Sequence, residues 1–146
     1  MKKRQRISDL VGSLSLPAGS RHDPRYLGYF TLFNDGQYYE AHDLLEDLWL
    51  HDKQGPDGAF YKGLIQLAGA FVHLQKNRLR PAAALFKLAR TNLEKYPDRH
   101  DGLDMKMVRA LIEDWLAELE SKNFETNPLN ARHAPKLELS ADYLHD

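Results

Sequence analysis

The segment from about Asp57 to Lys76 constrains the fold more than any other part of the chain. Apolar residues lie on nearly every side of the helix that this segment predicts, at Phe60, Tyr61, Leu64, Ile65, Leu67, Phe71, Val72 and Leu74. A helix that is hydrophobic all round is buried among other elements rather than lying at a surface. The segment therefore predicts a domain in which other helices surround this one.

Proline, glycine and asparagine divide the rest of the chain into four further predicted helices. They run over about 23–34, 37–50, 80–95 and 104–120, and the first begins at Asp23-Pro24, an N-cap followed by a proline in the first turn. No segment shows the sustained alternation of a strand. The sequence therefore predicts an all-α fold, an antiparallel bundle of about five helices with a buried central helix and an extended C-terminal tail.

The length of 146 residues fits one domain. We expect a flexible N-terminal leader over 1–22, the helical bundle over 23–120 and a polar tail over 121–146. The chain has no cysteine, which excludes disulfides and thiolate metal sites and fits a reducing compartment. No apolar run reaches the length of about 18 residues that spans a bilayer. These features predict a cytoplasmic protein that does not enter a membrane.

Charge is segregated along the chain. Residues 34–52 contain six acids and no lysine or arginine, whereas residues 53–95 contain eight bases and two acids. Complementary faces of packed helices explain this pattern. A phosphate-binding patch is the alternative, at Lys76, Arg78, Arg80, Lys87 and Arg90. Because no interleaved aromatic residues or nucleic-acid motif accompany these bases, nucleic acid is not expected as a partner.

One stripe of the central helix differs from the rest of its surface. At about 100° per residue, one face carries Ala59, Gly63, Gln66, Ala70 and His73, with Gly69 beside it. Small residues let a neighbouring helix approach closely. Gln66 and His73 are the two polar residues of the stripe, and buried polar groups need partners.

The helix over 37–50 carries three residues at i, i+4 and i+7 spacing, His42, Glu46 and Trp49. An imidazole and a carboxylate one turn apart can hydrogen-bond, and they can also supply two ligands to a divalent metal. If this helix packs antiparallel to the central helix, His42 and Glu46 face the stripe with Gln66 and His73. The predicted polar site thus comprises His42, Glu46, Gln66 and His73, with Trp49 as its wall.

The stretch from Phe33 to Trp49 resembles the bacterial and archaeal family known as domain of unknown function 309. The family is marked by His-x-x-x-Glu-x-x-Trp on a helix, matched here by His42, Glu46 and Trp49. The likeness continues through Gly63–Ala68, His73 and Ala83–Leu85, over roughly 26–96. Asp43 departs from the glutamate that often follows the family's histidine. The resemblance implies a helical bundle and a suspected functional motif, but no established reaction.

Three functions are compatible with the predicted site. The polar residues can be structural, they can form a pocket for a small molecule or a protein partner, or they can serve a metal-dependent, hydrolase-like enzyme. In the last case His42, Glu46 and His73 are the ligands of a divalent metal, the one cofactor that the sequence suggests. The familiar His-Glu-x-x-His zinc arrangement is absent. The sequence leaves the ligand, the partner and the oligomeric state open.

The remaining histidines lie near predicted turns or in the tails. They are His22, His51, His100, His133 and His145. Exposed polar side chains are the default interpretation at such positions.

Overall fold

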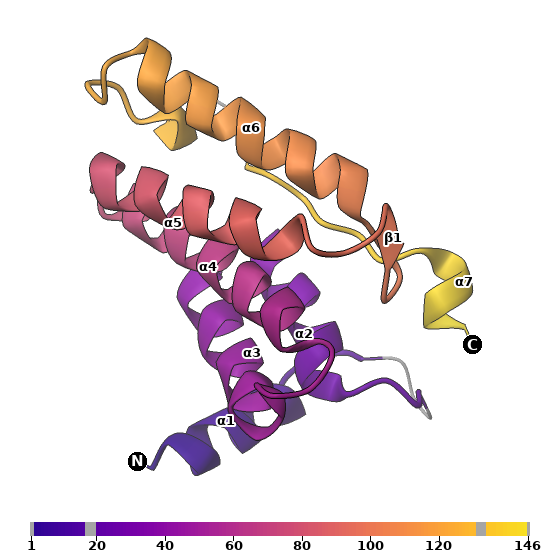
Figure 1. Ribbon diagram of the computed structural model, residues 1–146. Coiled ribbons are helices and arrows are strands. Elements are labelled where there is room, and N and C mark those ends of the chain that lie inside the picture. Colours follow the sequence, from indigo (N-terminus) through magenta and orange to yellow (C-terminus); the bar gives the residue numbers. More distant parts are fainter. Residues whose placement is uncertain (1, 17–19, 131–133, 146) are drawn as a thin grey trace.

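A computed structural model describes residues 2–16, 20–130 and 134–145, which form a helical bundle (Figure 1). Its helices are α1 (Lys3–Gly12), α2 (Pro24–Asn34), α3 (Tyr38–Asp52), α4 (Gly58–Gln75), α5 (Leu79–Leu93), α6 (Met105–Ser121) and α7 (Ala141–Leu144). A 3-10 turn covers Pro128–Asn130, and a hairpin pairs β1 (Arg99–His100) with β2 (Leu103–Asp104). The all-α prediction is confirmed, and α2 to α6 are the five predicted helices. No helix formed by these residues is both long and apolar enough to cross a membrane.

Helix α4 is the centre of the bundle, with α3 and α5 packed against it. Phe60, Leu64 and Phe71 of α4 are completely buried. The ring of Phe71 stacks on Tyr38 of α3 at 5.1 Å and meets Trp115 of α6 edge-on at 4.9 Å. One side chain of α4 thus connects helices on both sides, and the predicted burial of the central helix is confirmed.

The small residues of α4 allow α5, rather than α3, to approach α4 closely. A Cβ atom on Gly63 would lie 2.6 Å from Cγ of Leu93, and one on Gly69 would lie 3.1 Å from Cδ1 of Leu85. Both leucines belong to α5. The expectation that this stripe faces the helix of His42 therefore needs correction, because the close approach is made by the other neighbour.

The N-terminal segment, expected as a flexible leader, contains a helix that packs on the bundle. Ile7 of α1 is only 5% exposed, and Leu10 and Leu14 pack against the core. An isolated helix of this length is marginal in water, so docking stabilises it. The apolar residues 7, 10, 11 and 14 have helical spacing, a signal that the basic start of the chain obscured. Residues 17–19 lie outside the described parts of the chain.

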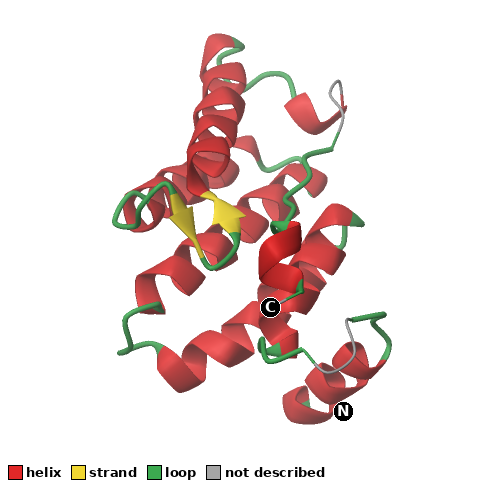
Figure 2. Cartoon of the chain, turned by 90° about the vertical axis from the view of Figure 1, so that its right-hand side faces the viewer, coloured by secondary structure: helices red, strands yellow, loops and turns green. Residues whose placement is uncertain are grey.

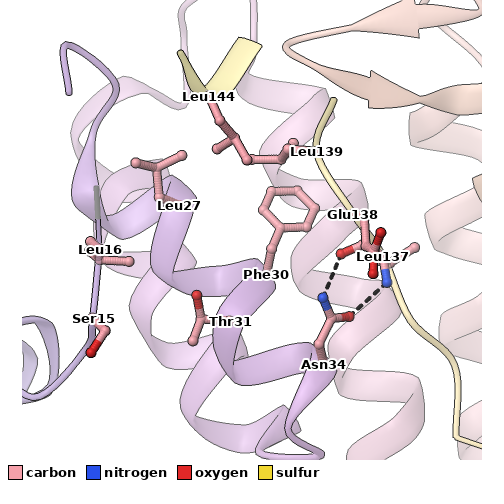
Figure 3. A pocket seen from close by; sticks show the side chains of 10 residues that line it. All are labelled: Ser15, Leu16, Leu27, Phe30, Thr31, Asn34, Leu137, Glu138, Leu139 and Leu144. Atoms are coloured by element: carbon pink, nitrogen blue, oxygen red, sulfur yellow. Dashed lines mark hydrogen bonds between the residues drawn. The ribbon is translucent and has the colours of Figure 1, made fainter. Parts of the chain in front are cut away.

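The C-terminal segment also packs on the bundle, whereas the sequence predicted a polar, extended tail. Leu137 is completely buried, and the Asn34 side chain bonds both of its backbone groups at 2.7 Å (Figure 3). An apolar cleft of about 290 Å³ remains between this segment and α2. Figure 3 shows Phe30 at its centre with Leu139 beside it. The alternating leucines at 137 and 139 explain the packing, because one face of an extended segment can be apolar.

The β1–β2 hairpin was not predicted. Figure 2 shows it as the small pair of strands beside the helices. Its turn has positive φ angles at Asp101 (46°) and Gly102 (77°), and such a turn favours Asp-Gly. The Asp101-Gly102 dipeptide is the signal for this turn in the sequence. The strands on either side are only two residues long, too short to show an alternating pattern.

We predict that Gly63→Ala destabilises the protein by about 1–3 kcal/mol, because the new methyl group must displace the body of Leu93. Gly69→Ala is the matched control. Its methyl group meets only the end of Leu85, and its gain in helix propensity, about 0.5–1 kcal/mol, offsets the contact. Urea unfolding measures both. Equal effects at the two positions would contradict the close approach of α5 at Gly63.

Candidate functional site

His42 and Glu46 lie together on α3, and each side chain is 29% exposed. Nε2 of His42 is 3.8 Å from Oε2 of Glu46, longer than the roughly 3 Å of a hydrogen bond. The hydrogen bond expected between them is therefore absent from the structure. Glu46 instead accepts one from Nζ of Lys3 at 2.9 Å, so its partner comes from α1.

The neighbouring carboxylates of α3 are paired with bases in the same way. Asp43 meets the Arg6 guanidinium of α1 at 2.7 Å, and Asp47 accepts from Arg25 of α2 at 2.8 Å. The side chains that form ion pairs with these three carboxylates therefore precede α3 in the chain. The basic region after α3, which the sequence had suggested as the partner of this segment, contributes the charge of Lys62 near Glu46.

Trp49 completes this face of α3. Nζ of Lys62 lies 4.4 Å from the centre of the indole ring, and Nζ of Lys53 lies 5.6 Å from it. Ammonium groups are attracted to the negative face of an indole at such distances. We call His42, Asp43, Glu46, Asp47 and Trp49 the acidic face of α3.

His42 and Glu46 differ in charge at neutral pH. Burial lowers the pKa of His42 below its ordinary value, although the charges of Glu46 and Asp43 act to raise it. For Glu46, burial acts to raise the pKa, but the hydrogen bond from Lys3 and the neighbouring charges lower it overall. The site thus holds a neutral imidazole beside a carboxylate. Nδ1 of His42 is buried and has no hydrogen-bond partner within the described segments.

The structure does not bring all the predicted site residues together, because Gln66 of α4 bonds to α5 whereas His42 and Glu46 lie on α3. Oε1 of Gln66 accepts a hydrogen bond from Nδ2 of Asn92 at 2.8 Å, so its partner belongs to α5. His73 lies near the end of α4, where burial and the charges of Arg78 and Lys76 lower its pKa. Its Nδ1, like that of His42, is buried without a partner among the described residues. The stripe follows α5, which explains why Gln66 bonds there and not with His42 or Glu46.

Two of the bases considered as a phosphate patch have partners elsewhere in the bundle. Arg80 lies over the ring of Phe124 at 4.3 Å, and Arg90 donates to Glu113 at 2.9 Å.

One group of described residues could hold a metal ion, and it is not the predicted one. Asp57, His100 and Asp101 place ligand atoms within 4.8 Å of one another. His42, Glu46 and His73 do not form such a group within the described segments.

The histidines expected to be exposed divide into two groups. His51 and His145 are exposed, but His22 is half-buried and stacks on Tyr143 at 3.7 Å. His100 is half-buried as well, and its Nε2 lies 2.7 Å from Oδ1 of Asp57. The fold brings together residues 43 positions apart in the chain, and no local pattern could reveal this contact. His133 lies outside the described residues.

The comparisons with known proteins concern the segment that holds the acidic face of α3. Residues 26–85 match the family Domain of unknown function (DUF309). The resemblance seen in the sequence is thereby confirmed over α2, α3, α4 and the first part of α5. No solved structure matches the chain significantly.

One curated relative of this DUF309 segment is an "Uncharacterized protein" of Aquifex aeolicus (strain VF5). It is 30% identical over 91 residues, which cover 62% of this chain and 27% of the relative. The match thus spans about a quarter of the relative's length. It supplies no activity that could be carried over.

We predict that stability falls as the pH drops below 6.5, the ordinary pKa of histidine. His42 and His73 have lower pKa values in the folded chain, so between those values and 6.5 the unfolded chain binds more protons. Their contribution is complete above 6.5 and is lost toward lower pH. Urea unfolding at about pH 7.5 and 5.5 measures the difference, which should shrink in His42→Gln/His73→Gln. An unchanged difference in that variant would contradict the assignment.

Proposed function

We propose that the acidic face of α3 binds a basic amphipathic helix of a protein partner, and that α1 occupies this site within the chain. The observation that carries the proposal is the pair of contacts that α1 makes there, Lys3 to Glu46 and Arg6 to Asp43. Both contacts join a cationic side chain of one helix to an acidic side chain of another. The acidic face of α3 thus acts as a binding surface for cationic side chains.

The chemistry of the face suits ammonium and guanidinium groups. Charge-assisted hydrogen bonds to carboxylates are the stronger kind, and they fix the direction from which a cation arrives. Trp49 adds an aromatic surface over which Lys62 and Lys53 already lie. A cationic side chain can therefore find a carboxylate and an indole on one face of a single helix.

The contacts of α1 are those of an element that can be displaced. Ile7 is its one buried residue, and clefts of about 360 Å³ and 310 Å³ flank it on α3. The first cleft is lined by Tyr39, whose side chain is largely exposed. A helix with larger apolar side chains would fill these clefts better than α1 does.

The free energies expected for the α1 contacts agree with an α1 that a partner can displace. Exposed ion pairs contribute about 0–1 kcal/mol each, and the Lys3 and Arg6 side chains are 38% and 45% exposed. Full burial of Ile7 adds roughly 1.5–3 kcal/mol, and the partly buried Leu10 and Val11 add a further apolar contribution. Ordering ten residues of helix opposes both gains. A few contacts therefore hold α1 in place, and a partner helix that makes more of them can displace it by mass action.

The test uses the full chain with α1 disabled by Lys3→Glu, Arg6→Glu and Ile7→Asp. A fluorescent peptide of residues 2–16 should bind this variant, and fluorescence anisotropy should show tighter binding than to the wild type, whose site α1 occupies. Affinity should fall as salt rises from about 50 to 300 mM, because the contacts are partly exposed ion pairs.

The matched control adds Asp43→Asn and Glu46→Gln to the disabled variant, which keeps the shapes of both side chains. Peptide affinity should then drop at least about tenfold, the equivalent of 1.4 kcal/mol. Equal affinity with and without these two carboxylates, or no binding to the disabled variant, would contradict the proposal.

A further inference from the structure

A second cluster lies outside the acidic face of α3, where the β1–β2 hairpin meets the start of α4. Asp57 is the residue before α4, while His100 ends β1 and Asp101 begins the turn. Nε2 of His100 is 2.7 Å from Oδ1 of Asp57, and ligand atoms of all three residues lie within 4.8 Å of one another. Two segments distant in the chain thus direct three metal-binding groups toward one point.

We propose that Asp57, His100 and Asp101 form a binding site for a divalent first-row transition-metal ion such as Mn²⁺ or Zn²⁺. One imidazole nitrogen and two carboxylate oxygens form a donor set that suits these ions better than Mg²⁺ or Ca²⁺, which prefer oxygen ligands alone. A metal about 2.1 Å from each ligand requires ligand separations of roughly 3–3.4 Å. The present distances, 2.7 Å between Nε2 of His100 and Oδ1 of Asp57 and at most 4.8 Å among the ligand atoms, lie on either side of that range.

The three groups are half-buried together at this corner of the fold. Nε2 of His100 lies 2.7 Å from Oδ1 of Asp57, and across the described residues no lysine or arginine forms an ion pair with either aspartate.

Surrounding contacts hold the three groups in place. The His100 ring lies 4.7 Å from the rings of both Phe60 and Tyr96, which limits its rotation. The Tyr26 hydroxyl donates to the backbone carbonyl of Asp101 at 2.7 Å, and Ser140 donates its N–H to the carbonyl of Gly102 at 2.8 Å. A metal site needs such supporting contacts to keep its ligands oriented.

The cluster is accessible from solvent. A cleft of about 280 Å³ beside the hairpin is lined by His100, Asp101 and Tyr143, among others. Three protein ligands leave at least one coordination position open on a four-coordinate ion. Water or an anionic ligand in this cleft would complete the coordination.

The test titrates the full-length, tag-free, chelator-treated protein with Mn²⁺, Zn²⁺ and Mg²⁺ by calorimetry. We expect one site per chain for Mn²⁺ and Zn²⁺, at least about tenfold weaker binding of Mg²⁺, and a rise in melting temperature with the first two ions. Side-chain NMR during the Zn²⁺ titration should show the His100 resonances moving first. Absence of binding, or binding with no change at His100, would overturn the assignment.

Two variants and one control make the assignment specific. His100→Gln and Asp101→Asn should each weaken Mn²⁺ binding at least about tenfold. Asn tolerates the positive φ of Asp101, so this variant should keep the wild-type circular dichroism spectrum. His42→Gln is the matched histidine control and should bind Mn²⁺ like the wild type. Loss of binding in His42→Gln, with retention in the other two, would instead place the metal on the acidic face of α3.

Discussion

The close approach of α5 to α4 at Gly63 is the contact on which the cluster of Asp57, His100 and Asp101 depends. Because Gly63 has no side chain, Leu93 packs directly on the helix, and Asn92 reaches Gln66. The chain then continues to Tyr96, whose hydroxyl donates to the carbonyl of Pro56 and accepts from the N–H of Phe60. This bridge holds the start of α4 beside the hairpin and thereby positions Asp57 opposite His100. On the other side of α4, the stacking of Phe71 on Tyr38 positions α3.

Electrostatics explains why α1 docks where it does. The acidic face of α3 would repel itself if its carboxylates had no cationic partners, and Lys3, Arg6 and Arg25 supply those partners. The charges lie at the edge of the contact, with Ile7 buried. Such a contact is directed by charge and held by the apolar side chains of Ile7, Leu10 and Val11. The DUF309 match covers the acidic face but not α1.

The sequence predicted the helices well because their signals are local. Asp23-Pro24 opens α2 as expected, and the apolar surface of the 57–76 segment predicted the burial of α4. The site was predicted only in part. The spacing of His42, Glu46 and Trp49 showed that they share a face, but no local pattern shows that Gln66 turns toward Asn92 or that Lys3 reaches Glu46. The Asp57–His100 contact was missed for the same reason, because it forms only when α5 and the hairpin are placed. Side-chain pairing between distant segments is a property of packing, not of periodicity.

A charge exchange between α1 and α3 tests the central claim most directly. Lys3→Glu and Glu46→Lys should each accelerate hydrogen exchange of the α1 backbone amides, since each places like charges where an ion pair now holds the helix. The double variant Lys3→Glu/Glu46→Lys restores opposite charges in the reverse order. The account predicts that exchange in this double variant returns toward the wild-type rate. It would be contradicted if α1 exchanged at the same rate in all four proteins, or if the double variant were no better protected than the single ones.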